Sequence, residues 1–265
     1  MRNLYFFLLA GVLGAIAFPS EHQFAYSASI NPTGYFSPYT GHFDYWTRCA
    51  DDHYDLERRI SYCKSILSDG RHSQLEVLTE IGNAYFAARK YNDALANYRD
   101  ALRYDDSPCV PQGRCYGLRA NEGLEESLVL SGQFDPAMDH VNARIKNDAY
   151  PAEPYDQRCW LRAIAGKDLD LALADCNQAL KIDARDATAL DSRGLVNFKL
   201  NKLTEALADY DAALDRDSHL AGAWYVRGII KLRNGNADAG NDDIETSKKR
   251  DSTVAERYAD YGVTP

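Results

Sequence analysis

Apolar residues recur every three or four positions through most of the chain between residues 75 and 254. This spacing predicts amphipathic helices, because residues three and four apart share one face of an α-helix. The apolar stretches come in pairs, and a short polar turn such as ARKYN, GKDLD or NGNAD separates the two members of a pair. We therefore expect short antiparallel helices joined by tight turns.

The helical pairs repeat with a fixed period. The phrase DCNQALKID begins at residue 175, and DYDAALDRD begins 34 residues later at residue 209. This register gives five units, with an insertion at 109–117 and one extra residue at Ala152. The units are 75–108, 118–151, 153–186, 187–220 and 221–254. Position twenty of each unit is small and position thirty-one is always Asp. A unit of this size cannot bury its apolar face alone, so we expect neighbours to stack.

The pattern resembles the tetratricopeptide repeat, whose unit has an aromatic residue at position four, Gly at position eight and Ala at position twenty. Trp224, Gly228 and the segment GNAYFAARKYNDALANYRDAL carry the resemblance, which covers roughly residues 75–254. It implies an all-α fold: a right-handed superhelical solenoid of about five helix-turn-helix units with helical end caps.

Two units depart from the family pattern, which leaves their helix packing open. The unit 118–151 has Glu125 at position eight and Arg144 at position twenty-seven, and the unit 153–186 has Trp160 at position eight. The stretch LALADCNQALKI, with the unit that follows it, is also similar to exported bacterial tetratricopeptide proteins. That likeness implies an envelope location.

The first residues have the composition of a secretory signal peptide. Arg2 precedes the apolar run LYFFLLAGVLGAIAF, and Ala15 and Ala17 are placed as signal peptidase prefers. We expect residues 1–17 to be removed and the mature chain to have no stable membrane insertion. An uncleaved anchor is the alternative, although the run is shorter than the ~20 residues that span a bilayer comfortably. The predicted location is the periplasm of a Gram-negative bacterium.

Segments outside the repeats have separate predictions. Residues 18–46 are rich in Tyr, Phe, Gly, Pro and Ser, which indicates an irregular arm that packs its rings on the first helices or binds a partner. Residues 47–74 are expected to form an N-terminal helical cap. Residues 255–265 are expected to form a C-terminal cap, because a solenoid needs closed ends for solubility.

Six cysteines in an exported chain predict disulfides. Pairing between sequence neighbours is the simplest of the possible connectivities. It joins Cys49 to Cys63, Cys109 to Cys115, and Cys159 to Cys176. The last two face each other across one helical pair, and the alternative there is a pair of buried thiols, because helix axes about 8 to 10 Å apart can exceed disulfide reach.

Charge and motifs argue against several functional classes. The formal net charge of −9 disfavours nucleic acid, whose phosphates require a basic surface. The tetrapeptide SYCK at 61–64 has no companion catalytic motif. The segment NGNADAGNDDIE at 234–245 partly fits a calcium loop, but Ala239 stands where that loop needs Gly. We expect no catalytic residue, metal or cofactor.

Binding is expected on the inner face of the stack, which the first helix of each unit lines. Reading positions five, nine and twelve gives a mainly apolar lane for a partner segment. The residues are Asn83, Phe86, Leu161, Ile164, Leu195, Phe198, Tyr225, Ile229 and Leu232. The alternative is that position twelve belongs to the core and that the segment after Ala255 folds into the groove.

The sequence therefore predicts a non-catalytic scaffold in the bacterial envelope that binds another protein or a peptide. A calcium-responsive or enzymatic envelope protein and a purely structural spacer are the alternatives. Fold class alone does not name a partner.

Overall fold

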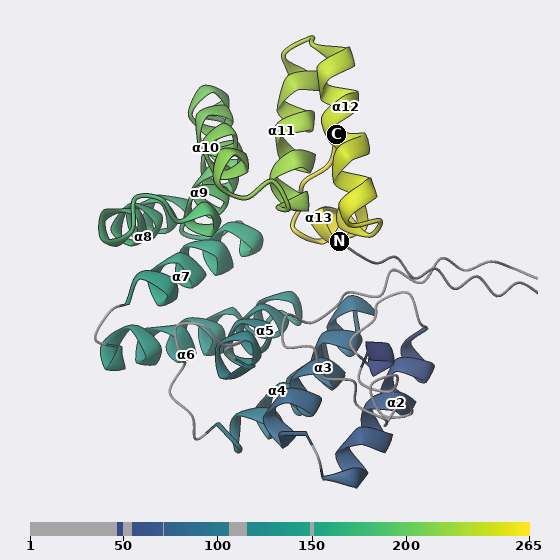
Figure 1. Cartoon of the computed structure of the whole chain (residues 1–265). Helices are drawn as coiled ribbons and strands as arrows, with labels where there is room; N and C mark the ends of the chain where they lie inside the picture. Colours follow the sequence, from purple (N-terminus) through teal and green to yellow (C-terminus); the bar gives the residue numbers. More distant parts are fainter. Residues whose placement is uncertain (1–46, 50–54, 71, 106–115, 149–150) are drawn as a thin grey trace, which may run out of the picture. The chain divides into compact units, whose positions relative to one another are not determined.

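The computed structural model describes residues 47–49, 55–70, 72–105, 116–148 and 151–265 (Figure 1). These residues contain helices and no strand. The helices are α2 (Leu56–Asp69), α3 (Gln74–Ala87), α4 (Tyr91–Leu102), α5 (Tyr116–Leu130), α6 (Phe134–Asn147), α7 (Ala152–Ala165), α8 (Leu169–Ile182), α9 (Ala187–Lys199), α10 (Leu203–Arg216), α11 (Ala221–Arg233), α12 (Ala237–Arg250) and α13 (Val254–Asp260).

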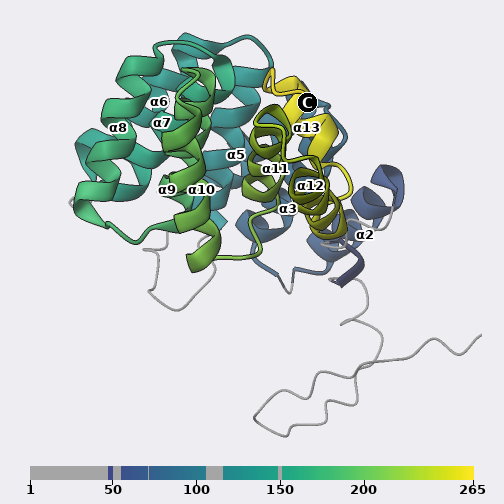
Figure 2. The same cartoon turned by 90° about the horizontal axis from the view of Figure 1, so that it is seen from above.

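The helices form successive antiparallel pairs: α3 with α4, α5 with α6, α7 with α8, α9 with α10, and α11 with α12. The first helices of neighbouring pairs also pack on one another, from α3 through α5, α7 and α9 to α11. Figure 2 shows the same order of pairs from a second direction. The prediction of an all-α solenoid of stacked helical pairs is confirmed.

Glycine at position eight lets two helices of a pair approach closely. A Cβ atom on Gly82 would lie 2.6 Å from the ring of Tyr98, and one on Gly194 would lie 2.9 Å from the ring of Tyr210. Both distances are shorter than real Cβ contacts, so the tyrosine rings occupy the space that a side chain would take. Tyr98 and Tyr210 are fully buried as a result.

Aspartate at position thirty-one shapes the turn between units. The Oδ1 atom of Asp217 accepts a hydrogen bond from the backbone N–H of His219 at 2.8 Å, and Asp251 binds the N–H of Thr253 at 2.8 Å. An Asp side chain that bonds the backbone two residues ahead stabilises a tight turn. Asp183 makes the same bond with the backbone N–H of Arg185 at 3.0 Å, so the recurrence of Asp has a common local cause in the last three units.

The third pair contains a disulfide in the place of the Gly–Tyr contact. Cys159 of α7 is bonded to Cys176 of α8, with their Cα atoms 5.4 Å apart. Cys176 matches Tyr210 in the 34-residue register, whereas Cys159 matches Gly194 only if α7 begins at Ala152, as it does. The start of α7 is thus offset by 35 residues from that of α9, whereas the start of α8 is offset by 34 from that of α10. The extra residue lies in the turn between α7 and α8, and the predicted register of α7 is wrong by one residue.

A row of arginines crosses the unit boundaries, and we call Arg158, Arg193 and Arg227 the arginine ladder. Arg193 donates to Asp209 of its own unit at 2.6 Å and to Asn177 of the preceding unit at 3.0 Å. The other two arginines repeat this arrangement, Arg158 with Asp175 and Asn142, and Arg227 with Asp243 and Asp211. Each ladder arginine therefore joins two neighbouring units through charged hydrogen bonds.

The N-terminal end of the stack is covered by α2. Asp55 caps this helix by accepting a hydrogen bond from the backbone N–H of Arg58 at 3.0 Å, and Gly70 ends it with a left-handed φ of 68°. The predicted Cys49–Cys63 disulfide is present and holds the preceding segment against α2.

Several predictions lie outside the described residues: the signal peptide at 1–17, the arm at 18–46, most of the insertion at 109–117, and the pairing of Cys109 with Cys115. Among the helices that are described, none combines the length and the apolar character needed to cross a bilayer.

Candidate binding groove

One residue from each first helix contributes to a common surface, which we call the inner groove. Its residues are Phe86 of α3, Glu126 of α5, Trp160 of α7, Asp191 of α9 and Tyr225 of α11. With the corrected register of α7, Trp160 is the structural equivalent of Leu195, at the position for which the sequence had suggested Leu161. The inner groove is consequently more aromatic and more acidic than the predicted apolar lane.

The last helix of the chain supplies two tyrosine rings to this groove. The ring of Tyr258 lies 6.5 Å from that of Trp160 and 5.7 Å from that of Tyr225, measured between centroids. Tyr261 packs edge-on against Trp160 at 5.5 Å and against Tyr258 at 5.2 Å. Both tyrosines are almost completely buried, with exposed fractions of 3% and 2%. Edge-to-face contacts at these distances are favourable beyond the burial of area.

The start of α11 is shaped to receive Tyr258. A Cβ atom at Gly222 would overlap the hydroxyl of Tyr258, so this position requires glycine while the ring is in place. Val254 and Val263, on either side of the two tyrosines, are completely buried. The segment from Val254 to Val263 therefore fits closely against the inner groove.

Polar contacts hold the same segment at several units. Lys199 of α9 donates to the backbone oxygen of Tyr261 at 2.5 Å, and Arg233 of α11 donates to the backbone oxygen of Thr264 at 3.0 Å. At the other end of the array, Arg89 Nε and the hydroxyl of Tyr91 both donate to Asp260 Oδ2, at 2.7 Å and 3.0 Å. The segment contacts the first unit as well as the last ones.

Two carboxyl groups line the groove close to Arg257 of α13. Glu126 accepts a hydrogen bond from Trp160 Nε1 at 2.8 Å. Asp191 Oδ1 is buried and has no hydrogen-bond partner among the described residues. Burial raises the pKa of each carboxyl to about 7, and the positive charge of Arg257 opposes that increase in both. An open cavity of about 380 Å³ remains beside these three side chains.

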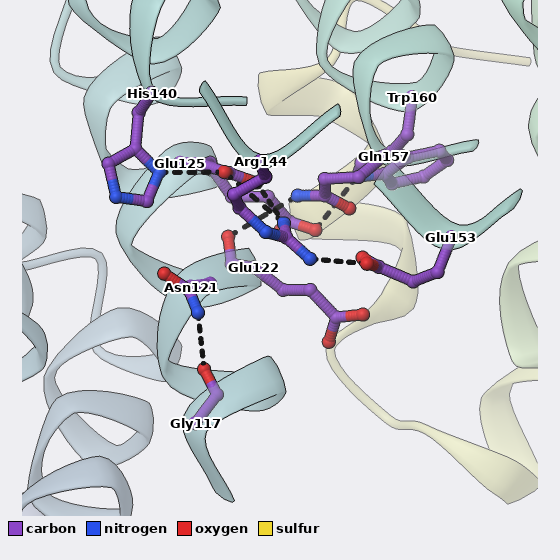
Figure 3. A network of polar contacts seen from close by, with 10 residues as sticks. Gly117, Asn121, Glu122, Glu125, His140, Arg144, Glu153, Gln157 and Trp160 are labelled. Atoms are coloured by element: carbon purple, nitrogen blue, oxygen red, sulfur yellow. Dashed lines mark hydrogen bonds and ion pairs between the residues drawn. The ribbon is translucent and has the colours of Figure 1, made fainter. Parts of the chain in front are cut away.

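A second polar network lies beneath this surface, between α5, α6 and α7 (Figure 3). Glu125 is completely buried, and its two oxygens lie 2.8 Å from His140 Nδ1 and 3.0 Å from Arg144 Nη1. Arg144 also pairs with Glu153 at the start of α7. Figure 3 shows the guanidinium of Arg144 between the two carboxylates, so the network joins the second unit to the third.

The structure places most of the predicted binding residues in the core. Leu161, Ile164, Leu195, Phe198, Tyr225 and Ile229 are buried, whereas Asn83, Phe86 and Leu232 are partly exposed. Leu161 and Ile164 belong to the core, as do Leu195 and Ile229 in units whose register is unchanged. The sequence also allowed an alternative, in which the segment after Ala255 folds into the groove. The structure shows this arrangement, with Tyr258 and Tyr261 packed against Trp160.

The sequence places Glu126 at position nine and Asp191 at position five of inner-face helices, although neither was among the predicted binding residues, and it gave no indication of Trp160. It also left Tyr258 and Tyr261 as parts of a simple end cap. Tyr258 lies in α13 and Tyr261 is the C-cap residue of that helix, so their spacing of three residues can bring both rings to one side, and this was the available signal.

The segment proposed as a calcium loop forms the turn before α12 and the start of that helix. Asn236 Oδ1 accepts a hydrogen bond from the backbone N–H of Ala239 at 3.4 Å, so this side chain caps the helix. Within the residues that can be described, no group of three or more His, Cys, Asp or Glu side chains is arranged to hold a metal ion.

A family model described as "Tetratricopeptide repeat" matches residues 79–115 and 192–240. The chain carries tetratricopeptide repeats. The matched ranges include parts of the first, fourth and fifth units, and the stacked helical pairs extend the tetratricopeptide array through the two units between them.

Two solved structures have the same fold. TTC0263, a thermophilic tetratricopeptide protein of Thermus thermophilus, is 19% identical; the match covers 72% of this chain and 100% of that one, with a TM-score of 0.55. The Cut9–Hcn1 hetero-tetramer of the APC/C is 17% identical, with a TM-score of 0.53. That match covers 78% of this chain and 43% of the other. Both comparisons show a shared tetratricopeptide fold.

Proposed function

We propose that the protein is a non-catalytic scaffold whose inner groove binds a peptide segment of another protein. The observation that carries this proposal is that a segment of the chain itself already occupies the groove. Residues 254–264 place two aromatic side chains and two backbone oxygens against side chains of α7, α9 and α11. A surface that holds one short helix through spaced aromatic anchors is suited to hold another of the same kind.

The compartment is part of the same proposal. Disulfides persist in oxidising compartments, and the Cys49–Cys63 and Cys159–Cys176 bonds are consistent with export. The apolar run at residues 4–18 supports secretion to the bacterial envelope. The net charge of −9 favours a protein partner over nucleic acid.

The test uses a photo-crosslinking amino acid at Phe86, which is partly exposed at the edge of the groove. The matched control carries the same amino acid at Leu171 on α8, which is 54% exposed and does not line the groove. We expect irradiation of the full chain in intact cells to give a discrete covalent adduct from position 86 and none from position 171. Equal labelling from both positions, or none from either, would contradict the proposal.

A further inference from the structure

The segment in the inner groove does more than close the end of the stack. A cap needs to contact only the last unit, which it shields from solvent. Residues 254–264 instead contact α11 and α12 of the fifth unit, Lys199 of the fourth and Trp160 of the third. Asp260 also binds Arg89 at the first unit. This reach along the array is typical of a groove ligand.

The aromatic part of the interaction has a defined spacing. Tyr258 and Tyr261 are three residues apart and meet around the indole ring of Trp160. Gly222 leaves the space for the first ring, and the backbone oxygen of Tyr261 accepts from Lys199. The groove therefore has room for two aromatic side chains that are one helical turn apart.

The charged part lies directly before the first ring. Arg257 shares a cavity with Glu126 and Asp191, and it forms an ion pair with Asp251 at 2.7 Å. Asp191 Oδ1 is buried without a hydrogen-bond partner in the part of the chain that is described. An acceptor oxygen that is shielded from water and unpaired is unfavourable, so a cationic donor that reaches Asp191 Oδ1 would be stabilised there.

The internal segment does not fill its site. The open cavity of about 380 Å³ extends from Glu126 and Asp191 towards His219 and Arg250. This space is open to solvent, so it is a hollow beside Arg257 that a larger side chain can enter. An external segment with a longer or better directed basic side chain could occupy it, while the aromatic contacts would be the same.

From these contacts we infer that the groove is selective for a basic residue followed directly by an aromatic one, with a second aromatic three positions later. Arg257, Tyr258 and Tyr261 are the internal version of this motif, and a partner that presents it displaces α13. The inference rests on the proposed function and specifies the chemistry of the partner.

The experiment uses the full chain with Tyr258→Ala and Tyr261→Ala, which removes both rings from the groove. The probe is a fluorescent peptide with the sequence of residues 251–264, and its binding is measured by fluorescence anisotropy. Apparent affinity scales with the fraction of molecules whose site is free. We expect the double variant to bind the peptide about tenfold or more tightly than the native chain does.

Peptide controls test the motif itself. A peptide with Arg257→Glu, and another with both tyrosines replaced by Ala, should each lose about tenfold or more in affinity for the double variant. The first change places a negative charge beside Glu126 and Asp191, and the second removes two anchors that are buried in the groove. A double variant that retains its helical circular dichroism and binds all three peptides equally, or binds none, would overturn the inference.

Protein controls separate binding from folding. Tyr104→Ala changes an exposed tyrosine on the described surface and should leave affinity at the native value. Asp260→Ala removes the anchor to Arg89 and Tyr91 without emptying the core, so it should give an intermediate gain even if the double variant folds poorly. If the double variant does not fold, and a folded Asp260→Ala chain binds the peptide no more tightly than the native chain, the displacement of α13 by a partner is also contradicted.

The outcomes distinguish the inference from the proposed function. Crosslinking from position 86 without any preference for the basic-aromatic peptide would support the scaffold function and contradict the motif. If neither crosslinking nor a peptide preference is observed, both the scaffold function and the motif are contradicted. If sedimentation shows instead that the native chain is a dimer and that the double variant is not, the groove binds the C-terminal segment of a second copy. In that case the inference of a different partner protein is wrong.

Discussion

Glu125 and Arg144 form a buried ion pair at the two positions where the second unit departs from the family pattern. Their Oε2 and Nη1 atoms lie 3.0 Å apart, and Glu125 has no exposed surface. The equivalent residues in the first unit are Gly82 and Ala101, both small, and the ring of Tyr98 fills the space beside Gly82. The two departures therefore compensate for each other, and the unit keeps its helical pair through charge complementarity in place of close backbone approach.

Arg144→Ala should lower the free energy of unfolding by about 3 to 5 kcal/mol, because it leaves Glu125 buried without its main counter-charge. The double variant Glu125→Gly/Arg144→Ala should recover a large part of this loss, since it restores the residues of the first unit. Urea denaturation followed by circular dichroism gives both values. Arg103→Ala is the control: its pair with Asp100 is exposed, and we expect a change of about 0.5 kcal/mol or less. If Arg144→Ala lowers the free energy of unfolding as little as Arg103→Ala does, the stabilising role of the Glu125–Arg144 pair is contradicted.

Arg193→Leu tests the arginine ladder. The change removes the bonds to Asp209, which is buried, and the bond to Asn177 of the preceding unit. Because Arg193 is itself 28% exposed, we expect a loss of about 2 kcal/mol, smaller than for a fully buried pair. Hydrogen exchange should show the loss of protection concentrated in α8, α9 and α10. Protection that falls equally in α3 and α4 would mean that the ladder does not act locally.

The Cys159–Cys176 bond should stabilise the chain by about 3 kcal/mol, as expected for a loop of this length. Replacing both cysteines with Ala should lower the melting temperature under non-reducing conditions. The variant Cys159→Gly/Cys176→Tyr should melt higher than the double Ala variant, because it recreates the contact between Gly194 and Tyr210. Equal melting temperatures for these two variants would contradict the corrected register of α7.

The carboxyls of the groove predict a pH dependence with a definite sign. Burial raises the pKa of Glu126 and Asp191 to about 7, well above their ordinary values. The folded chain therefore binds more protons than the unfolded chain between about pH 4 and pH 7. Their contribution to stability is most favourable below this window and is lost as the pH rises through about 7.

Asp191→Asn isolates this effect, because Asn cannot ionise. The gain in melting temperature of the variant over the native chain should be larger at about pH 8 than at about pH 5. Glu245→Gln, at an exposed carboxyl on α12, serves as the control and should lack that trend. A constant difference between Asp191→Asn and the native chain across this range would show that Asp191 keeps an ordinary pKa.

Much of the fold followed from the sequence, because its strongest signals are local and repeated. The Asp at position thirty-one forms the same turn in successive units, and Gly with Tyr forms the same close contact. The Cys49–Cys63 and Cys159–Cys176 pairings were also predicted correctly. Each of these features joins residues that are close in the sequence, at most 17 positions apart, so local spacing is sufficient information.

The groove was less predictable, because its composition depends on contacts between distant residues. The period alone placed the extra residue before α7, whereas the bonds of Arg158 and Cys159 show that α7 is displaced by one residue and that the extra residue lies in the turn after it. That single step exchanges Leu161 for Trp160 at the surface. The burial of Tyr258 depends on Trp160, about a hundred residues earlier, and no local pattern encodes such a partner.

The bond between Arg89 and Asp260 spans 171 residues and exists only while α13 is seated. A peptide that displaces α13 must therefore also break this bond between the first repeat unit and the C-terminal segment. Binding of a short peptide would in this way allow the first and last repeat units to move independently. Dyes attached to α4 and α12 could report this movement as a change in the distance between them.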